Sequence, residues 1–198
     1  MHYPRQTASW GDYDNDGDLD LYVGNETSRT LRAPSQLFRN NGDGTFTDLA
    51  PFAGVMNHGY AKAVIWGDYD GDRLLDLYVS NSGGNNRLYR NTGRGTFVDE
   101  ARRLGVSQPI ESFPAWFWDF DNDSALDLFV STTSGPIGVL ALNPLGVDIP
   151  AEGSGRRILQ ETVADHIDVM HLYRNDGKGG FQEIAKEVNL TYPAEPMG

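Results

Sequence analysis

Short apolar runs alternate along this chain with clusters of Asp, Asn and Gly, and the alternation repeats three times. Runs such as 63–66 and 75–79 are too short for helices and are bounded by turn residues, so they predict β-strands. In each repeat one run enters an aspartate-rich loop, a second run leaves it, and an Asn-Xaa-Gly-Xaa-Gly hairpin follows. The hairpin glycines supply the positive-φ positions that a tight turn needs. Each repeat is therefore expected to form four short antiparallel strands, the size of a β-propeller blade.

Two segments recur in every repeat. The aspartate-rich segments are 10–23, 66–79 and 118–130, and the hairpin segments are 37–46, 88–97 and 172–181. The loops begin at Asp12, Asp68 and Asp119, which are 56 and then 51 residues apart. Self-similarity at this period is the signature of a repeat architecture. We predict an all-β fold, a partial β-propeller of three four-stranded blades that cover 1–56, 57–107 and 108–198.

The third repeat is longer than the others. It takes 55 residues from the first loop aspartate to the Arg-Asn pair of the hairpin, against 27 and 22 residues in the other two. The extra residues, about 135–169, begin with a Gly/Pro-rich stretch and continue with apolar residues at helical spacing: Leu159, Val163, Ile167 and Met170. This pattern predicts an inserted loop with a short amphipathic helix. The helix is expected to pack against the blade edge, and a ligand-binding excursion is the alternative.

Each loop carries Asp at positions 1, 3, 5 and 9 of nine residues. This spacing places carboxylates on one concave side of a turn, and a main-chain carbonyl at position 7 completes an all-oxygen cage that suits Ca²⁺ better than Mg²⁺. The predicted calcium ligands are Asp12, Asp14, Asp16 and Asp20; Asp68, Asp70, Asp72 and Asp76; and Asp119, Asp121, Asp123 and Asp127. The position 7 carbonyls belong to Asp18, Leu74 and Ala125.

Two other interpretations of the loops were weighed against calcium. One is a solvated acidic turn without a metal, and the other is a catalytic carboxylate pair of the glycosidase kind. A catalytic pair needs two acids in opposed environments, whereas here the same set recurs three times within a local loop. Up to three Ca²⁺ ions therefore account for the pattern best.

The three loops are not equivalent. Position 6 of such a loop makes a sharp turn that favours glycine, and only the first loop has one, Gly17. Arg73 and Ser124 occupy that position in the other loops, at an expected strain of about 1 kcal/mol. Arg73 also places a positive charge beside the predicted cation. We therefore expect the first site to bind calcium most tightly and the second most weakly.

Composition narrows the possible functions. The formal net charge is −12, but the twelve ligand aspartates and Asp18 account for 13 of the 28 acidic residues, and without them the charge would be +1. The acidity thus belongs to the loops, and it argues against nucleic-acid binding through a basic surface. The chain has no cysteine, which excludes disulfides and thiolate metal sites. No apolar run approaches the length of a membrane span, and the N-terminus lacks the apolar core of a signal peptide.

Two further patterns carry structural expectations. Trp10, Trp66, Trp116 and Trp118 recur beside the loops, and we expect core packing rather than a sugar-stacking platform. The Arg-Asn pair of each hairpin is interpreted as a device that forms the turn and ties blades together, rather than as a ligand contact.

The aspartate loop followed by Leu-Tyr-Arg-Asn-Asn-Gly-Asp-Gly-Thr-Phe resembles FG-GAP/VCBS repeats, and is most similar to those of the bacterial ASPIC/UnbV proteins and the related cartilage acidic proteins. The resemblance covers nearly the whole chain. It implies a calcium-stabilised propeller, usually seven-bladed, that is extracellular, periplasmic or at the cell surface and is associated with adhesion or with protein or carbohydrate partners. Arg73, Ser124 and the long third-repeat insertion depart from the pattern.

The repeat spacing also predicts further blades. Val55 and Val106 each precede the next loop by 13 residues, and Leu190, the equivalent residue in the third repeat, would place another loop beyond Gly198. We therefore expect a fragment of a larger propeller whose remaining blades are its partners.

The sequence favours a non-enzymatic, calcium-binding scaffold. The alternative is an accessory propeller portion of a polysaccharide-active enzyme such as a lyase. Its candidate charged residues are those of the insertion: Glu152, Arg156, Arg157 and Glu161.

Overall fold

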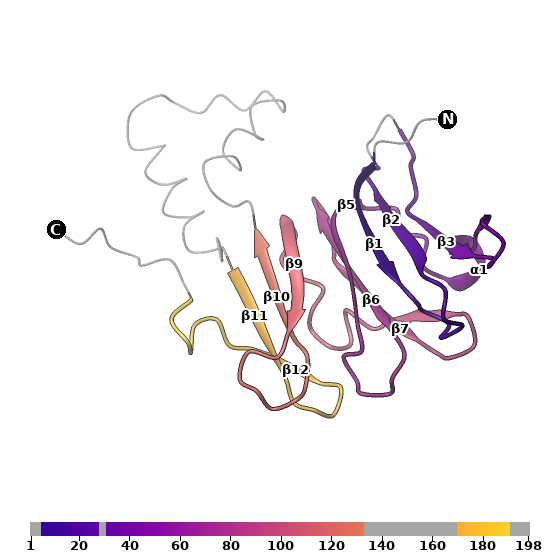
Figure 1. Cartoon of the computed structure of the whole chain (residues 1–198). Coiled ribbons are helices and arrows are strands. Elements are labelled where there is room, and N and C mark those ends of the chain that lie inside the picture. The colour runs from indigo at the N-terminus through magenta and orange to yellow at the C-terminus, as the bar shows by residue number, and fades with distance from the viewer. Residues whose placement is uncertain (1–4, 28–30, 133–169, 191–198) are drawn as a thin grey trace, which may run out of the picture.

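Three four-stranded sheets stand side by side in the computed structural model (Figure 1). The structure describes residues 5–27, 31–132 and 170–190. The strands of the first sheet are β1 Arg5–Gly11, β2 Asp20–Asn25, β3 Gln36–Asn40 and β4 Phe46–Asp48. Those of the second are β5 Tyr60–Gly67, β6 Asp76–Ser82, β7 Arg87–Asn91 and β8 Phe97–Asp99. Those of the third are β9 Ser112–Trp118, β10 Asp127–Thr132, β11 Met170–Asn175 and β12 Phe181–Glu183.

Every sheet is an antiparallel meander in which each strand pairs with the next strand along the chain. We refer to β1–β4, β5–β8 and β9–β12 as blades 1, 2 and 3. Within the described residues the single helix is α1 Ala50–Ala53, after blade 1. The structure confirms the prediction of an all-β partial propeller made of three four-stranded blades. The predicted insertion at about 135–169 lies outside the described residues. Met170, the last of the four residues at helical spacing, begins strand β11, so the helix prediction is wrong at this residue.

The apolar core lies between blades because the central strands bury both of their faces. In β6, Leu77 and Val79 belong to the cluster shared with blade 1, and Tyr78 belongs to the cluster shared with blade 3. This division follows from the alternation of side chains along a strand. Leu77 and Tyr78 are fully buried, and burial of such a leucine contributes about 1.5–3 kcal/mol to folding. Blade 2 is thus held on both sides by apolar packing.

An aromatic residue of each following blade packs on the backbone of the blade before it. The Trp66 Nε1–H of blade 2 donates to the carbonyl of Ser9, 3.2 Å away, and a Cβ added to Gly11 would lie 2.8 Å from the Trp66 ring. Phe117 of blade 3 packs on Gly67 of blade 2: a Cβ added to Gly67 would lie 2.6 Å from the Phe117 ring. Glycine is needed at both positions because any side chain there would collide with the neighbouring blade.

The strand register corrects the expectation for the tryptophans. Gly11 pairs with Asp20, Gly67 with Asp76, and Trp118 with Asp127. Trp118 therefore occupies the glycine position of blades 1 and 2, and Phe117 occupies the position of Trp66. Core packing holds for Trp66 alone: Trp10, Trp116 and Trp118 are 55%, 44% and 67% exposed. The expectation failed for these three because their side chains point to faces of blades 1 and 3 that no described blade covers.

Candidate metal centre

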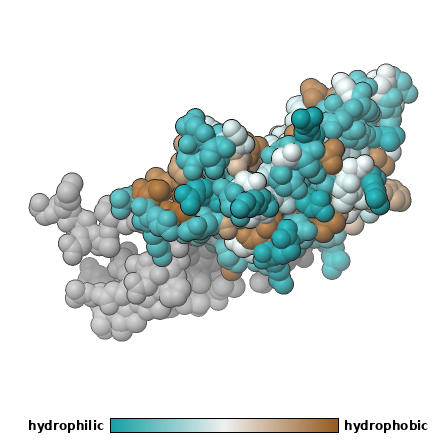
Figure 2. Space-filling view, turned by 90° about the horizontal axis from the view of Figure 1, so that it is seen from below, coloured by the Kyte–Doolittle hydropathy of each residue, from teal (hydrophilic) through white to brown (hydrophobic). Residues whose placement is uncertain are grey.

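The three aspartate loops lie at the same edge of the molecule. They connect β1 to β2, β5 to β6 and β9 to β10, at the lower end of the sheets in Figure 1. Figure 2 shows the molecule from this side, where hydrophilic residues cover most of the described surface and apolar residues form separate patches. The hairpins β3–β4, β7–β8 and β11–β12 turn at this edge as well. Each loop therefore lies beside the hairpin of its own blade.

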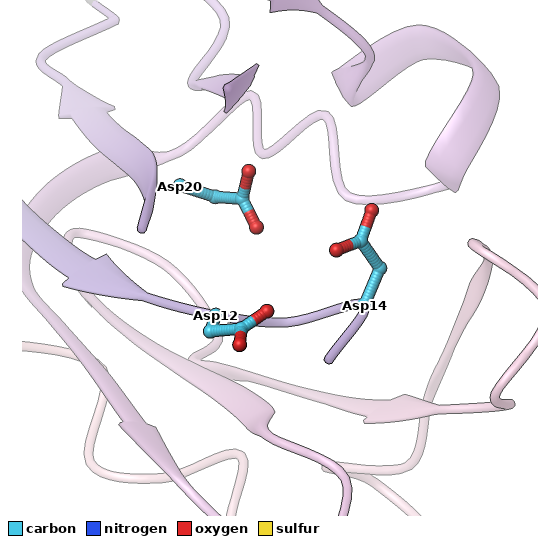
Figure 3. A group of neighbouring side chains, drawn as sticks. All are labelled: Asp12, Asp14 and Asp20. Carbon is cyan, nitrogen blue, oxygen red and sulfur yellow. The ribbon is translucent and has the colours of Figure 1, made fainter. Parts of the chain in front are cut away.

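Three carboxylates converge in each loop. In blade 1, Asp12, Asp14 and Asp20 each offer an oxygen, and these oxygens lie within 4.8 Å of one another (Figure 3). The same limit holds for the other two groups: Asp68, Asp70 and Asp76, and Asp119, Asp121 and Asp127. These are positions 1, 3 and 9 of the predicted ligand set. Oxygens at such spacing can share one hard cation, which takes 6–8 oxygen ligands when it is Ca²⁺.

The position 1 carboxylate is held by the loop's own backbone. In the first loop, Asp12 Oδ1 accepts from the Asp16 N–H at 3.1 Å and Oδ2 accepts from the Gly17 N–H at 3.0 Å. The equivalent bonds run from Asp72 and Arg73 to Asp68, and from Asp123 and Ser124 to Asp119. These bonds orient both oxygens of each carboxylate.

The position 9 carboxylate is buried and joins the loop to the hairpin. Asp76 Oδ2 accepts from the Tyr69 N–H at 3.2 Å, and Oδ1 accepts from the Asn91 N–H at 2.8 Å. Asp20 makes the same pair of bonds with Tyr13 and Asn40, and Asp127 with Phe120 and Asn175. All three carboxylates are at most 1% exposed. A buried carboxylate is stable only with partners of this kind.

The position 5 aspartates act differently from the other three. The Oδ1 atoms of Asp16, Asp72 and Asp123 accept from the N–H groups of Asp18, Leu74 and Ala125 at 2.8–2.9 Å. They are not part of the converging groups of carboxylates in the described structure. The side-chain bond instead shapes the turn that presents the position 7 carbonyl. Coordination by position 5 and by the carbonyls of Asp18, Leu74 and Ala125 stays a prediction.

The backbone makes a left-handed turn twice in each loop. At position 6, Gly17, Arg73 and Ser124 have φ values of 93°, 70° and 73°, as expected for a position that favours glycine. Position 4 is also left-handed, with φ values of 58°, 76° and 61° at Asn15, Gly71 and Asn122. Sequence reasoning missed this second turn, although the residues there carry the signal because Gly and Asn tolerate that conformation best.

Burial changes the protonation of the loop carboxylates. Loss of solvent, with repulsion from neighbouring aspartates as a smaller cause, raises the pKa of Asp20 to about 6 and that of Asp76 to about 7. The pKa of Asp127 is raised in the same way, as are those of Asp14 and Asp70 at position 3. Backbone hydrogen bonds to the position 9 carboxylates oppose this effect. A bound cation would offset the same desolvation and repulsion.

The blades and loops together define a β-propeller-type repeat protein in which each described blade presents one acidic loop. A profile of the FG-GAP-like repeat family matches residues 12–79 and 68–130, which together span more than half of the chain. The chain belongs to the FG-GAP-like repeat family, as the loop and hairpin motifs predicted.

Three curated relatives are cartilage acidic protein 1 from different vertebrates. The protein of Xenopus tropicalis is 32% identical over an alignment of 120 residues, which covers 58% of this chain and 18% of that protein. The proteins of Mus musculus and Homo sapiens are each 32% identical over 90 residues, or 45% of this chain and 14% of theirs. The chain thus spans less than a fifth of the length of these relatives.

A solved structure of an Agrocybe aegerita lectin, described as recognising non-reducing terminal N-acetylglucosamine, has 17% sequence identity and a TM-score of 0.45. The superposition covers 88% of this chain and 36% of the lectin. A score of this size does not by itself define a shared fold. Among the described residues of the present chain, no helix is long and apolar enough to cross a membrane.

Proposed function

We propose that each aspartate loop binds one Ca²⁺ ion and that the chain serves as a non-enzymatic binding scaffold whose blades are held by these ions. The observation that carries the proposal is the convergence of three carboxylates in every loop. Positions 1 and 9 are oriented by backbone N–H groups, so the charge is gathered at a structural cost that a cation would offset. Family membership supports the same function.

Substitution of the position 3 aspartate is expected to weaken ion binding in each loop with little effect on the fold. Asp70 accepts only a 3.4 Å bond from the Asp72 N–H, the Asp16 N–H makes the equivalent contact with Asp14, and the described backbone donates none to Asp121. Replacing these aspartates with asparagine should therefore remove ligand charge without disturbing the fold. The test is calorimetric titration of the 198-residue chain with Ca²⁺ and, separately, with Mg²⁺.

The unmodified chain should bind up to three Ca²⁺ ions, more tightly than Mg²⁺. The triple variant Asp14→Asn, Asp70→Asn, Asp121→Asn should keep its circular dichroism spectrum and lose calcium binding. Equal calcium binding by the two proteins, or no binding by either, would contradict the proposal.

The scaffold also requires a partner. By its family we propose an extracellular, periplasmic or cell-surface location and an adhesive contact with a protein or carbohydrate. The rival function, an accessory portion of a polysaccharide lyase, rests on the charged residues of the insertion, which lie outside the described residues. A glycan array combined with a lyase assay separates the two, because the scaffold predicts binding without cleavage.

We further propose that the face of blade 1 that points away from blade 2 is covered by another blade of the same kind. Trp10 and Phe46 lie 55% and 45% exposed on that face, whereas their equivalents in blade 2, Trp66 and Phe97, pack against blade 1. We propose that the three blades extend over residues 1–56, 57–107 and 108–198. An uncovered apolar sheet face favours association, so the isolated chain should self-associate in size-exclusion chromatography and Trp10→Gln should reduce this. A monodisperse monomer at all concentrations would contradict the docking proposal.

A further inference from the structure

One hairpin asparagine contacts the loops of two different blades. The Asn91 Nδ2 group of blade 2 donates to the carbonyl of Tyr13 in the loop of blade 1, at 2.8 Å, and to the carbonyl of Leu75 in its own loop, at 3.1 Å. The Asn91 backbone N–H donates to Asp76 at the end of that same loop. The Asn91 side chain is therefore a direct link between the first and second aspartate loops.

The link continues through the two backbone groups of Tyr13, its N–H and its carbonyl. Tyr13 lies at position 2, between the converging Asp12 and Asp14, and its own N–H donates to the Asp20 carboxylate at 3.3 Å. Hydrogen bonds and the backbones of Tyr13 and Asn91 thus connect Asp20 to Asp76: the Tyr13 N–H contacts Asp20, the Tyr13 carbonyl contacts the Asn91 side chain, and the Asn91 N–H contacts Asp76. Each member of this connection is fixed by the next one.

The same connection repeats between blades 2 and 3. Asn175 Nδ2 donates to the Tyr69 carbonyl at 2.7 Å and to the Leu126 carbonyl at 3.0 Å, and the Asn175 N–H donates to Asp127. The Tyr69 N–H in turn donates to Asp76. The three position 9 carboxylates, Asp20, Asp76 and Asp127, are therefore joined in one series.

We propose that Asn91 and Asn175 are shared positioning residues that couple calcium binding in adjacent blades. The proposal rests on calcium binding by the loops. An ion in the first loop fixes the Asp12–Asp14 segment and with it the Tyr13 carbonyl, which holds the Asn91 amide and hence the Asp76 carboxylate. The second loop then binds its ion with less ordering, and binding is positively cooperative along the blades.

The geometry of the asparagines suits this role. Both are 1% exposed, and buried hydrogen bonds of this kind are stronger than those in water. Their Oδ1 atoms accept from the N–H groups of Gly93 and Gly177, at 3.0 and 3.1 Å, which fixes the orientation of each amide. Both Nδ2 protons are used, one for each blade.

The first hairpin supplies a control within the same chain. The Asn40 Nδ2 group donates to Leu19 of its own loop at 3.3 Å, and its N–H donates to Asp20. Among the described residues it has no acceptor from a second blade. Asn40→Ala therefore removes the intrablade contact of this asparagine position without touching the link between loops 1 and 2.

Site deletion measures the coupling directly. Asp121→Asn leaves loops 1 and 2 able to bind; adding Asp14→Asn leaves loop 2 alone, and adding Asp70→Asn leaves loop 1 alone. Calcium calorimetry should show that loop 2 binds about fivefold or more tightly when loop 1 is filled, the lower end of typical coupling between sites. The cooperativity should fall in Asn91→Ala, where the exposed 3.3 Å bond from Asn15 Nδ2 to the Arg73 carbonyl is the remaining described hydrogen bond between the loops, and it should persist unchanged in Asn40→Ala.

The outcomes separate the two proposals. Three calcium ions bound independently, or with mutual repulsion, overturn the coupling and leave the calcium proposal intact. No calcium heat in any variant overturns both. If Asn91→Ala fails to fold, the deletion series in the chain that retains Asn91 still decides whether the loops are coupled.

Discussion

The first and second loops hold equivalent aspartates on similar backbones, but they differ in the residue at position 6 and in their neighbours. Position 6 is Gly17 in the first loop and Arg73 in the second, both left-handed. The second loop lies between two blades and receives Asn175 from the far side, whereas the first loop contacts one described neighbour. We therefore expect the aspartates to determine which ion suits the loops, and the surrounding residues to determine how strongly each loop is held.

The difference between the loops acts on stability and on affinity in separate ways. A left-handed non-glycine residue costs about 1 kcal/mol. Because Arg73 is left-handed in the folded loop, a strain that is equal with and without calcium cancels from calcium affinity and appears in the free energy of unfolding. The positive charge of Arg73 does not cancel, because it opposes only the bound ion.

The largest expected effect concerns the buried carboxylate of the second loop. Asp76→Ala would leave the buried N–H groups of Tyr69 and Asn91 without an acceptor. At about 1–3 kcal/mol for each orphaned group, the ion-free chain should lose about 2–6 kcal/mol of stability, measured by urea unfolding in EGTA. Asp20→Ala should behave similarly in the first loop.

Asp70→Ala is the matched control for that prediction. Asp70 accepts a single long bond, and its pKa is raised by burial and by repulsion from Asp72. Its removal should leave the stability of the ion-free chain within about 0.5 kcal/mol. Equal destabilisation by Asp76→Ala and Asp70→Ala would show that the buried bonds are not what holds the loop.

The two loops should also differ in the pH at which their buried aspartates release a proton. The pKa values of Asp20 and Asp76, about 6 and about 7, are above the ordinary carboxyl value. The folded ion-free chain therefore holds these protons more tightly than the unfolded chain does. This stabilisation is complete below about pH 4 and is lost as the pH rises through about 6 and 7.

Calcium binding should show the opposite trend with pH, because its ligands must be deprotonated. Affinity should fall below about pH 7 in the second loop and below about pH 6 in the first. Titrations of the single-site variants at several pH values, in two buffers of different ionisation enthalpy, would detect the released protons. Affinities that stay constant between about pH 5.5 and 8 would contradict this account.

The smallest expected effect is the exchange at position 6. Arg73→Gly should raise stability by about 1 kcal/mol and also tighten calcium binding in the second loop, and Gly17→Arg should do the reverse in the first. Arg73→Gln keeps the strain and removes the charge, so it should tighten binding without raising stability. If the first loop still binds calcium more tightly than the second in the chain that carries both Gly17→Arg and Arg73→Gly, position 6 does not explain the difference in affinity.

The sequence predicted the features that are local in the chain. Strands, hairpins and the left-handed position 6 follow from spacing and turn residues, and the hairpin asparagine was expected to tie blades together. The hydrogen bond between Asn91 and Tyr13 joins residues 78 positions apart in the sequence. It could not be predicted from repeat spacing because it depends on how the blades pack. The same reason explains the tryptophans, since exposure of Trp118 depends on its register in β9 rather than on its place beside a loop.

Thermal unfolding in calcium and in EGTA tests the central claim most directly. If calcium holds the loops, a hundredfold excess over the Kd contributes about 2.7 kcal/mol for each occupied loop. The midpoint of unfolding should then rise by about 5–10 °C per loop, and the triple variant Asp14→Asn, Asp70→Asn, Asp121→Asn should show no rise. An unmodified chain that unfolds at the same temperature in calcium and in EGTA would contradict the account.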